Sequence, residues 1–195
     1  IETLQDIRLA SIPLVESFVK EVTAGRDPSH GYEHMRKVAD NVLLIIEKDF
    51  PGLSEHERAI TEVTALVHDV CDHKYDFKGD LRERLLEHLN GNFGVKNTEL
   101  IMNIVDRTSY SKENNSIKAG KKLDWLEVLG EKGCLYRDIV SDADKLEALG
   151  HIGVVRCLEY GFTLLEKEGK SDEEIASTLV YHLIEHSKEK LFRLK

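Results

Sequence analysis

A chain of 195 residues is long enough for one domain with a sizeable hydrophobic core, and two domains would each be small. The formal net charge of −9 argues against a surface that coats nucleic acid, because contacts with a phosphate backbone need clustered Lys and Arg. This charge leaves open a small phosphorylated ligand in a local basic or metal-containing pocket.

The cysteines and the hydropathy indicate an intracellular protein. Cys71, Cys134 and Cys157 are odd in number and far apart, which is typical of reduced thiols rather than of a disulfide framework. None belongs to a C-x-x-C pair, so a thiolate zinc site is not expected. No apolar run approaches the roughly 20 residues that span a bilayer, and the first residues show no signal-peptide pattern. We therefore expect a cytoplasmic protein without a membrane partner.

Two helices are predicted at the beginning of the chain. The first spans residues 4–22, with Pro13 as a kink or an early break. Asp27-Pro28 is typical of an N-cap followed by proline at the first helical position, and it predicts a second helix that runs to about Asp49. His30 and His34 fall on the apolar stripe of this second helix, so both should point toward the core.

The next predicted helix carries the motif around which the chain is organised. Ser54-Glu55-His56-Glu57 matches a capping box, so the helix should begin there. Asp69 and Asp72 fall near its end, where the helix dipole is negative. Each carboxylate there costs a few tenths to about 1 kcal/mol unless a cation compensates. The adjacent pair His68-Asp69, with Asp72 one turn on, is therefore a reasonable half of a metal site.

The middle of the chain predicts further helices and one loop. A short helix at 81–89 and a turn at 90–94 precede a helix that Asn97 or Thr98 caps. Residues 109–122 are polar and basic without clear periodicity, so we expect a loop there.

The C-terminal part is predicted to be helical as well. An apolar segment begins at Trp125, residues 149–165 form a helix, and a second capping box at 171–174 opens a final helix that reaches residue 194. No strand, repeat or linker is indicated. We therefore expect an all-α fold with a single domain over residues 1–195.

Three groups of residues could together form a site. Taken alone, His34 is typical of a core histidine, His68-Asp69 of a helix-end cluster, and Asp142-Ala143-Asp144 of a cap or turn. Their occurrence together, in separate predicted helices, raises the possibility of a metal site.

Three blocks in this order resemble the H…HD…D pattern of the HD superfamily of metal-dependent phosphohydrolases. They are SHGYEH at 29–34, ALVHDV at 65–70 and VSDADKLEALG at 140–150. The likeness is closest to small single-domain HD hydrolases that act on nucleotides and related phosphate compounds. It extends from about Asp27 to the 183–194 segment, where His186, Glu189, Lys190 and Leu191 also match. The resemblance implies an HD-type helical bundle, and this family usually continues with helix beyond residues 191–195.

The resemblance also implies a metal centre with four protein ligands: His34, His68, Asp69 and Asp144. Two imidazoles and two carboxylates suit Mn²⁺, Fe²⁺, Ni²⁺, Zn²⁺ or Mg²⁺, and the family's habits favour Mn²⁺. Such an ion would hold a water and a phosphate oxygen, lower the pKa of the water and neutralise phosphoryl charge.

Further site residues follow from the same resemblance. Asp72 matches the acidic position that orients or deprotonates the attacking water, and Lys74 and Lys145 could grip phosphate oxygens as catalytic groups. The expected substrate-binding residues are His30, Lys37, His73 and Ser109. Lys37 stands where the family usually has Arg, which weakens a bidentate grip on phosphate.

Ser109 opens an S-[FY]-S-like element that the family places near the pocket. Residues 112–133 then look like an insertion. We expect a lid or specificity loop, or a mobile excursion, over about 109–133.

The expected reaction is hydrolysis of a nucleoside di- or triphosphate, with release of phosphate or pyrophosphate. A phosphomonoesterase acting on nucleoside monophosphates or other small phosphates is the alternative. A di-iron oxygenase would need more His ligands, for which only His73 and His88 are available, and a non-catalytic nucleotide sensor would be expected to have lost some ligands. The signatures of alarmone hydrolases and cyclic-dinucleotide phosphodiesterases are absent from the sequence.

Overall fold

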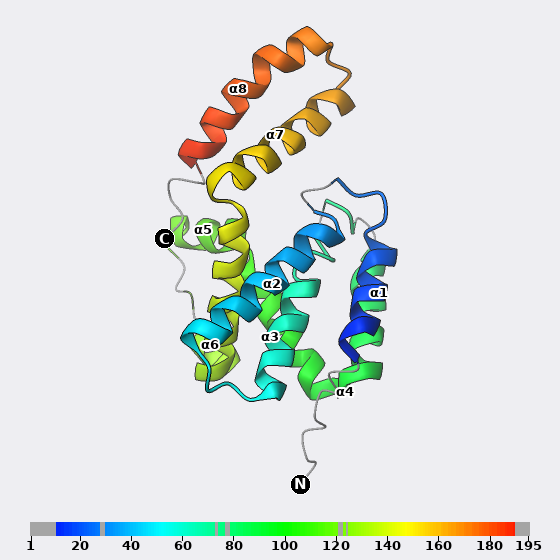
Figure 1. Ribbon diagram of the computed structural model, residues 1–195, viewed down its shortest axis with the longest axis vertical. Helices are drawn as coiled ribbons and strands as arrows, with labels where there is room; N and C mark the ends of the chain where they lie inside the picture. Colours follow the sequence, from blue (N-terminus) through cyan, green and yellow to red (C-terminus); the bar gives the residue numbers. More distant parts are fainter. Residues whose placement is uncertain are drawn as a thin grey trace.

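The computed structural model describes residues 11–27, 30–72, 74–76, 79–120, 123 and 125–189, and the fold in these ranges is all-α, as predicted (Figure 1). Eight helices lie in the described ranges: α1 (Ile12–Val22), α2 (Tyr32–Asp49), α3 (Glu55–Val67), α4 (Asp80–Thr108), α5 (Tyr110–Lys118), α6 (Trp125–Glu147), α7 (Gly150–Lys167) and α8 (Asp172–Glu189). No helix in this part of the chain is both long and apolar enough to cross a membrane.

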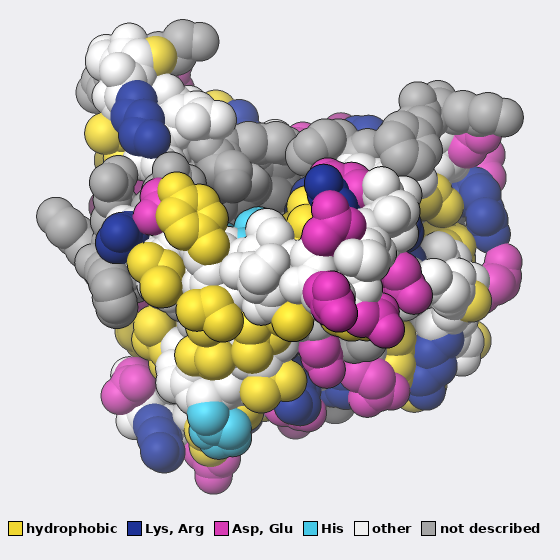
Figure 2. Space-filling view, turned by 90° about the horizontal axis from the view of Figure 1, so that it is seen from above, with side chains coloured by type: hydrophobic (Ala, Val, Ile, Leu, Met, Phe, Trp, Pro, Cys, Tyr) yellow, Lys and Arg dark blue, Asp and Glu magenta, His cyan; other side chains and the backbone are white. Residues whose placement is uncertain are grey.

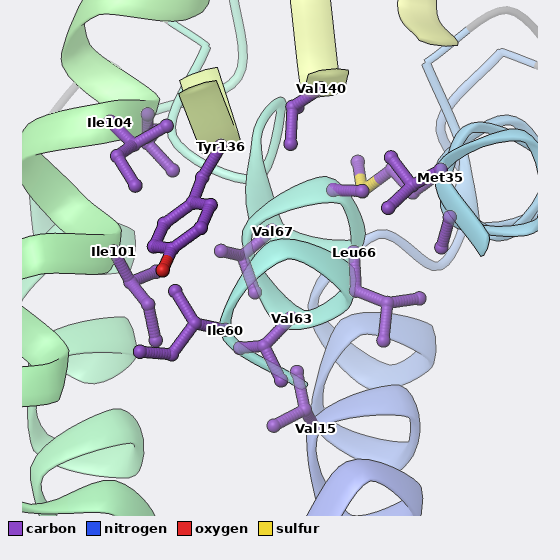
Figure 3. Packing of buried hydrophobic residues seen from close by; sticks show 14 of the residues in the cluster. Val15, Met35, Ile60, Val63, Leu66, Val67, Ile101, Ile104, Tyr136 and Val140 are labelled. Atoms are coloured by element: carbon purple, nitrogen blue, oxygen red, sulfur yellow. The ribbon is translucent and has the colours of Figure 1, made fainter. Parts of the chain in front are cut away.

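Helix α3 lies at the centre of the core. From Ala59 to Val67 every residue except Glu62 is buried. Figure 3 shows the surrounding side chains, which come from four other helices: Val15 of α1, Met35 of α2, Ile101 and Ile104 of α4, and Tyr136 and Val140 of α6. The residues that follow α3 therefore emerge from the best-packed part of the molecule, which fixes their position.

Helices α7 and α8 form a hairpin that projects from this core (Figure 1). Gly161 allows their close approach, because a Cβ atom at this position would lie 2.9 Å from Leu179 Cδ1 and 3.0 Å from His182 Cδ2. Several large apolar residues of the hairpin are exposed, namely Val155, Phe162, Val180, Tyr181 and Ile184. In the view from above, hydrophobic side chains gather in one patch beside a group of acidic ones (Figure 2).

Helix α1 is described from Ile12, so its predicted start at residue 4 lies outside the described residues, whereas α2 begins later than predicted. Pro13 lies in the first turn of α1, where its missing N–H is no loss, so it neither kinks nor breaks the helix. Helix α2 is capped by Gly31 rather than by Asp27. The carboxylate of Asp27 instead accepts hydrogen bonds from the Tyr75 hydroxyl and from His30 Nδ1, which draws it away from the helix.

The capping box of α3 is confirmed, but the helix ends earlier than expected. Ser54 accepts a hydrogen bond from the Glu57 backbone N–H, and the Glu57 carboxylate accepts one from the Ser54 N–H. The last helical residue is Val67, and His68 is the C-cap. Asp69 and Asp72 therefore lie in the turn after α3 and not within the helix.

Helix α4 is interrupted by a kink at Gly94, which has the non-helical angles φ 74° and ψ 162°. The turn predicted at 90–94 is therefore confirmed at its last residue only, since residues 90–93 are helical. The loop predicted at 109–122 is wrong, since Tyr110–Lys118 forms α5. Arg137 explains the order of this segment: it is buried, lies 2.7 Å from the Glu113 carboxylate, and stacks 3.7 Å from the Trp125 ring centroid. Within the described residues, the predicted lid at 109–133 is thus α5 and the start of α6.

The C-terminal predictions agree with the structure more closely. Helix α7 covers the predicted 149–165 segment, and the second capping box is present, with Ser171 and Glu174 exchanging hydrogen bonds. Helix α8 is described as far as Glu189, so the predicted extension to residue 194 lies outside the described residues.

Candidate metal centre

Three side chains from distant parts of the sequence converge beneath the α7–α8 hairpin. His34 comes from α2, His68 from the end of α3 and Asp144 from α6, and one donor atom of each lies within 4.8 Å of the other two. Nε2 of His34 is 3.3 Å from Asp144 Oδ1, and Nε2 of His68 is 3.8 Å from the same oxygen. The imidazole rings meet edge to face, with centroids 5.4 Å apart.

The orientation of His68 is fixed by the backbone of its own helix. Its Nδ1 lies 2.7 Å from the Ala65 carbonyl oxygen, which can only accept, so Nδ1 carries a proton. Nε2 is buried and has no hydrogen-bond partner among the described residues. In the neutral ring this nitrogen presents a lone pair to the centre, the arrangement that metal-binding histidines use.

The two imidazoles have opposite electrostatic environments. Burial lowers the pKa of His34, which favours its neutral, metal-binding form. For His68 burial acts in the same direction, but the nearby carboxylates of Asp69 and Asp144 outweigh it and raise the pKa. The two carboxylates attract positive charge at this nitrogen. They therefore favour a metal ion bound to His68 in the same way as they favour a proton on it.

Asp69 lies at the edge of the convergence. Its carboxylate is 3.8 Å from His68 Nε2, but it is not among the three donors that lie within 4.8 Å of one another. The backbone at this point is anchored by Arg26, whose guanidinium donates to the carbonyls of Asp69 at 3.0 Å and Val70 at 2.7 Å. Of the four predicted ligands, His34, His68 and Asp144 thus meet, and Asp69 stays a prediction.

These donors fit a metal ion. A buried imidazole nitrogen without a hydrogen-bond partner is costly unless something pairs with it, and a divalent cation would do so. Two nitrogens and a carboxylate oxygen suit several divalent transition metals, so the donor set does not fix which one is bound. His34, His68 and Asp144 could therefore hold a metal ion of unspecified identity.

Contacts between the turn after α3 and the segment before α2 position Asp72, Lys74 and His30. Asp72 Oδ1 accepts a hydrogen bond of 2.8 Å from the Lys74 backbone N–H, which shapes the turn. The Asp27 carboxylate accepts from His30 Nδ1 at 3.1 Å, and the Lys74 ammonium, which can only donate, lies 3.4 Å from His30 Nε2. This chain of contacts holds Lys74 over the Tyr160 ring, 4.7 Å from its centroid.

Two clefts adjoin the three donors. The first, which we call the hairpin cleft, has a volume of about 150 Å³ and lies between the turn after α3, α6 and the α7–α8 hairpin; its polar lining includes Asp144, Lys145, His30, Lys74, Arg156, His182 and His186. The second, of about 340 Å³, lies between α2 and α7 and is lined by residues that include His34, Lys37, Glu147, His151 and Arg156.

The remaining predicted residues are distributed unevenly. Lys145 lines the hairpin cleft and forms an ion pair of 3.2 Å with Asp142. Lys37 is exposed and lines only the second of these two clefts. Ser109 caps the end of α4 and is not among the lining residues of either cleft, whereas its neighbour Tyr110 lines the hairpin cleft. His73 lies outside the described residues.

Sequence reasoning missed the contribution of α7 and α8. Arg156 lines both clefts. Its positive charge adds to the effect of burial on the pKa of His34, and it opposes the carboxylates that raise the pKa of His68. The one available signal was an arginine in the otherwise apolar stretch Gly153–Leu158. His182, which no sequence motif singled out, is partly buried and lines the hairpin cleft from α8.

Comparison with known proteins supports the fold and leaves the activity open. No protein-family model matches the chain. It is similar to the uncharacterized protein YpgQ of Bacillus subtilis (strain 168), with 28% identity over 184 residues that make up 93% of this chain and 77% of that protein. A crystal structure of a structural-genomics target from Lactobacillus plantarum has the same fold, with a TM-score of 0.68 and 23% identity, over 96% of this chain and 83% of that one.

Proposed function

We propose that this protein is a metal-dependent phosphohydrolase of the HD superfamily that acts on a small phosphorylated compound, best represented by a nucleoside di- or triphosphate. The net charge of −9 argues against a nucleic-acid polymer as the substrate. The observation that carries the proposal is the convergence of His34, His68 and Asp144 beside a cleft with several cationic side chains. The three residues occupy the positions at which the sequence resembles the H…HD…D pattern.

The proposed centre is held by His34, His68 and Asp144, with Asp69 as a fourth ligand and Mn²⁺ as the expected ion. When bound, a divalent cation supplies a water of lowered pKa and neutralises charge on the phosphoryl group. The imidazole of His68 is prepared for this role, because the Ala65 carbonyl holds its proton on Nδ1 and leaves Nε2 to the centre.

The residues around the cleft would bind and orient the phosphate. Lys145 on α6 and Lys74 on the turn after α3 supply ammonium groups, and Arg156 on α7 supplies a guanidinium, all in the lining of the hairpin cleft. These groups can donate charge-assisted hydrogen bonds to phosphate oxygens. Asp72, held in the turn through Oδ1, would orient or deprotonate the attacking water through its carboxylate.

The alternative di-iron chemistry receives little support. It would require further histidine ligands, and the ring of His88 stacks on Phe18 with centroids 4.5 Å apart, at the packing of α4 against α1. Among the described residues, His34, His68 and Asp144 are the one group of three or more side chains whose donor atoms approach closely enough to hold a metal.

The test is ³¹P NMR of nucleoside triphosphates and, in separate samples, of nucleoside monophosphates, each incubated with the protein and Mn²⁺, with His68→Ala as the control. The proposal predicts phosphate or pyrophosphate with the intact protein and none with the variant or with chelator. Release from monophosphates alone would favour the phosphomonoesterase. Absence of turnover on both substrate classes would contradict the proposal.

A further inference from the structure

The hairpin cleft is rich in nitrogen-bearing side chains although the protein as a whole is acidic. His30, Lys74, Lys145, Arg156, His182 and His186 line it, against the carboxylates of Asp144 and Glu147. In a chain of net charge −9, this local excess of donors indicates a cleft that takes an anion.

Two of these donors belong to α8, remote in sequence from the metal centre. His182 and His186 are one helical turn apart, so they lie on the same face of α8. Their rings are nearly parallel, with an interplanar angle of 15° and centroids 6.4 Å apart, and both residues are partly buried. They therefore form one wall of the cleft, which we call the imidazole wall.

The packing of the hairpin holds this wall in place. His182 lies against Gly161 of α7, where a Cβ atom would be 3.0 Å from His182 Cδ2 and 3.6 Å from Nε2. A side chain at position 161 would therefore displace the imidazole or separate the helices. The absence of a side chain at Gly161 therefore allows the His182 ring to pack directly against α7.

Further lining of the cleft comes from His30, which precedes α2, and from Lys74 in the turn after α3. The His30 ring lies 5.5 Å from the ring of Tyr160 on α7, and Lys74 lies over the same tyrosine. Asp144 and Lys145 of α6 line the cleft as well. A ligand in this space thus meets the metal donor Asp144 on α6 and the imidazole wall on α8.

We propose that the imidazole wall binds the distal phosphates of a polyphosphate chain whose reacting phosphate lies at the metal centre. This inference rests on the proposed function for the identity of the reacting group. Imidazole N–H groups donate to phosphate oxygens, and the wall belongs to a different element from the groups around Asp144. A single phosphate bound at the metal centre would leave the wall without an anion, whereas a di- or triphosphate extends toward it.

The inference is tested by the binding of inorganic tripolyphosphate and of orthophosphate to the Mn²⁺-loaded protein, measured by titration calorimetry. The variant is His182→Gln combined with His186→Gln, and the control is His56→Gln, a histidine in the first turn of α3 that is not among the residues lining either cleft. We expect the double variant to bind tripolyphosphate about tenfold or more weakly, with orthophosphate affinity unchanged. Far-ultraviolet circular dichroism establishes that the variants keep their helix content.

Equal tripolyphosphate affinity of the double variant and the control would overturn the inference, and so would an equal loss for both ligands. The proposed function is judged separately by turnover. If the protein hydrolyses triphosphates and the double variant still binds tripolyphosphate as the wild type does, the phosphate-binding role of the imidazole wall is wrong, and the proposed hydrolase activity is supported. If no phosphate compound is hydrolysed but tripolyphosphate binding depends on the two histidines, the proposed hydrolase activity is wrong, and the phosphate-binding role of the imidazole wall is supported.

Discussion

Nε2 of His34 on α2 lies 3.3 Å from Oδ1 of Asp144 on α6. Without a cation, this geometry suits a hydrogen bond in which the imidazole N–H donates to the carboxylate. A metal ligand must instead present an unprotonated nitrogen. Binding of a cation at this pair would therefore release or relocate the proton on Nε2. Burial lowers the pKa of His34, which favours the neutral ring that a metal ion requires.

The role of Asp69 is tested by a comparison with Asp144. Asp144→Asn removes the carboxylate charge from the close group of three, so we expect tight Mn²⁺ binding to be lost. Asp69→Asn should weaken binding by about 10- to 100-fold, the range typical of losing a group that supports a metal ligand. Calorimetric titration with Mn²⁺ measures both. An Asp69→Asn protein with unchanged affinity would remove Asp69 from the ligand set.

The role of Asp72 is tested by a substitution that keeps the turn. Asn at this position retains an Oδ1 acceptor for the Lys74 N–H, so stability should be nearly unchanged. If the carboxylate serves as a general base, phosphate release by Asp72→Asn should fall about 10²- to 10⁴-fold. Asp76→Asn is the matched control, since that carboxylate accepts from the N–H groups of Leu81 and Arg82. Equal activity of both variants would leave Asp72 with a structural role alone.

The acid stability of the fold should depend on Glu57. Hydrogen bonds from Lys132, the Ser54 N–H and Tyr136 lower the pKa of this carboxyl from 4.5 to about 2. Because the folded pKa is depressed, its stabilisation is present above about pH 4.5 and is lost as the pH falls toward 2. Glu57→Gln should therefore lower the free energy of unfolding at pH 7 by about 1–3 kcal/mol, near the lower value because Lys132 is largely exposed.

Urea denaturation at pH 7 and pH 3 measures this effect. The difference between the wild type and Glu57→Gln should shrink at the lower pH. Glu55→Gln, an exposed neighbour in the same helical turn, should stay within about 0.5 kcal/mol of the wild type. A Glu57→Gln penalty that does not change with pH would show that packing, and not ionisation, accounts for it.

Substitution by alanine at two glycines of α4 should change the stability of the protein in opposite directions. Gly94, with φ 74° and ψ 162°, adopts a conformation that is essentially restricted to glycine, so Gly94→Ala should destabilise the protein by about 1–3 kcal/mol. Gly91 has helical geometry and nothing within 4 Å of an added Cβ, so Gly91→Ala should stabilise it by about 0.5–1 kcal/mol. Thermal unfolding of the two variants checks both, and a shift of equal sign would contradict the account of the kink.

Local sequence signals predicted those parts of the fold that depend on local interactions. The capping boxes at Ser54 and Ser171 were recognisable because both partners lie within four residues of each other. The predicted loop at 109–122 was wrong because α5 is stabilised by Arg137, a residue of α6 that periodicity within the segment cannot reveal. Likewise, Asp27 does not cap α2 as predicted, because its carboxylate accepts a hydrogen bond from Tyr75, which lies far from it in the sequence.

The same distinction holds for the candidate site. The motifs indicated His34, His68 and Asp144 before any geometry was known, and these three do converge. The side chains of Arg156 and His182 could not be placed at the cleft from sequence, because their position depends on how the α7–α8 hairpin returns over the turn after α3. Lys37 follows His34 by one helical turn, yet it is exposed and lies at the other cleft.

Electron paramagnetic resonance of a Mn²⁺ titration tests the central claim most directly, because the sharp six-line signal of the aqueous ion is lost on binding. The account predicts that the wild-type protein suppresses this signal up to one equivalent and that His68→Ala leaves it nearly unchanged, with His56→Gln behaving as the wild type. Equal suppression by the wild type and His68→Ala, or none by either, would contradict a metal centre at His34, His68 and Asp144.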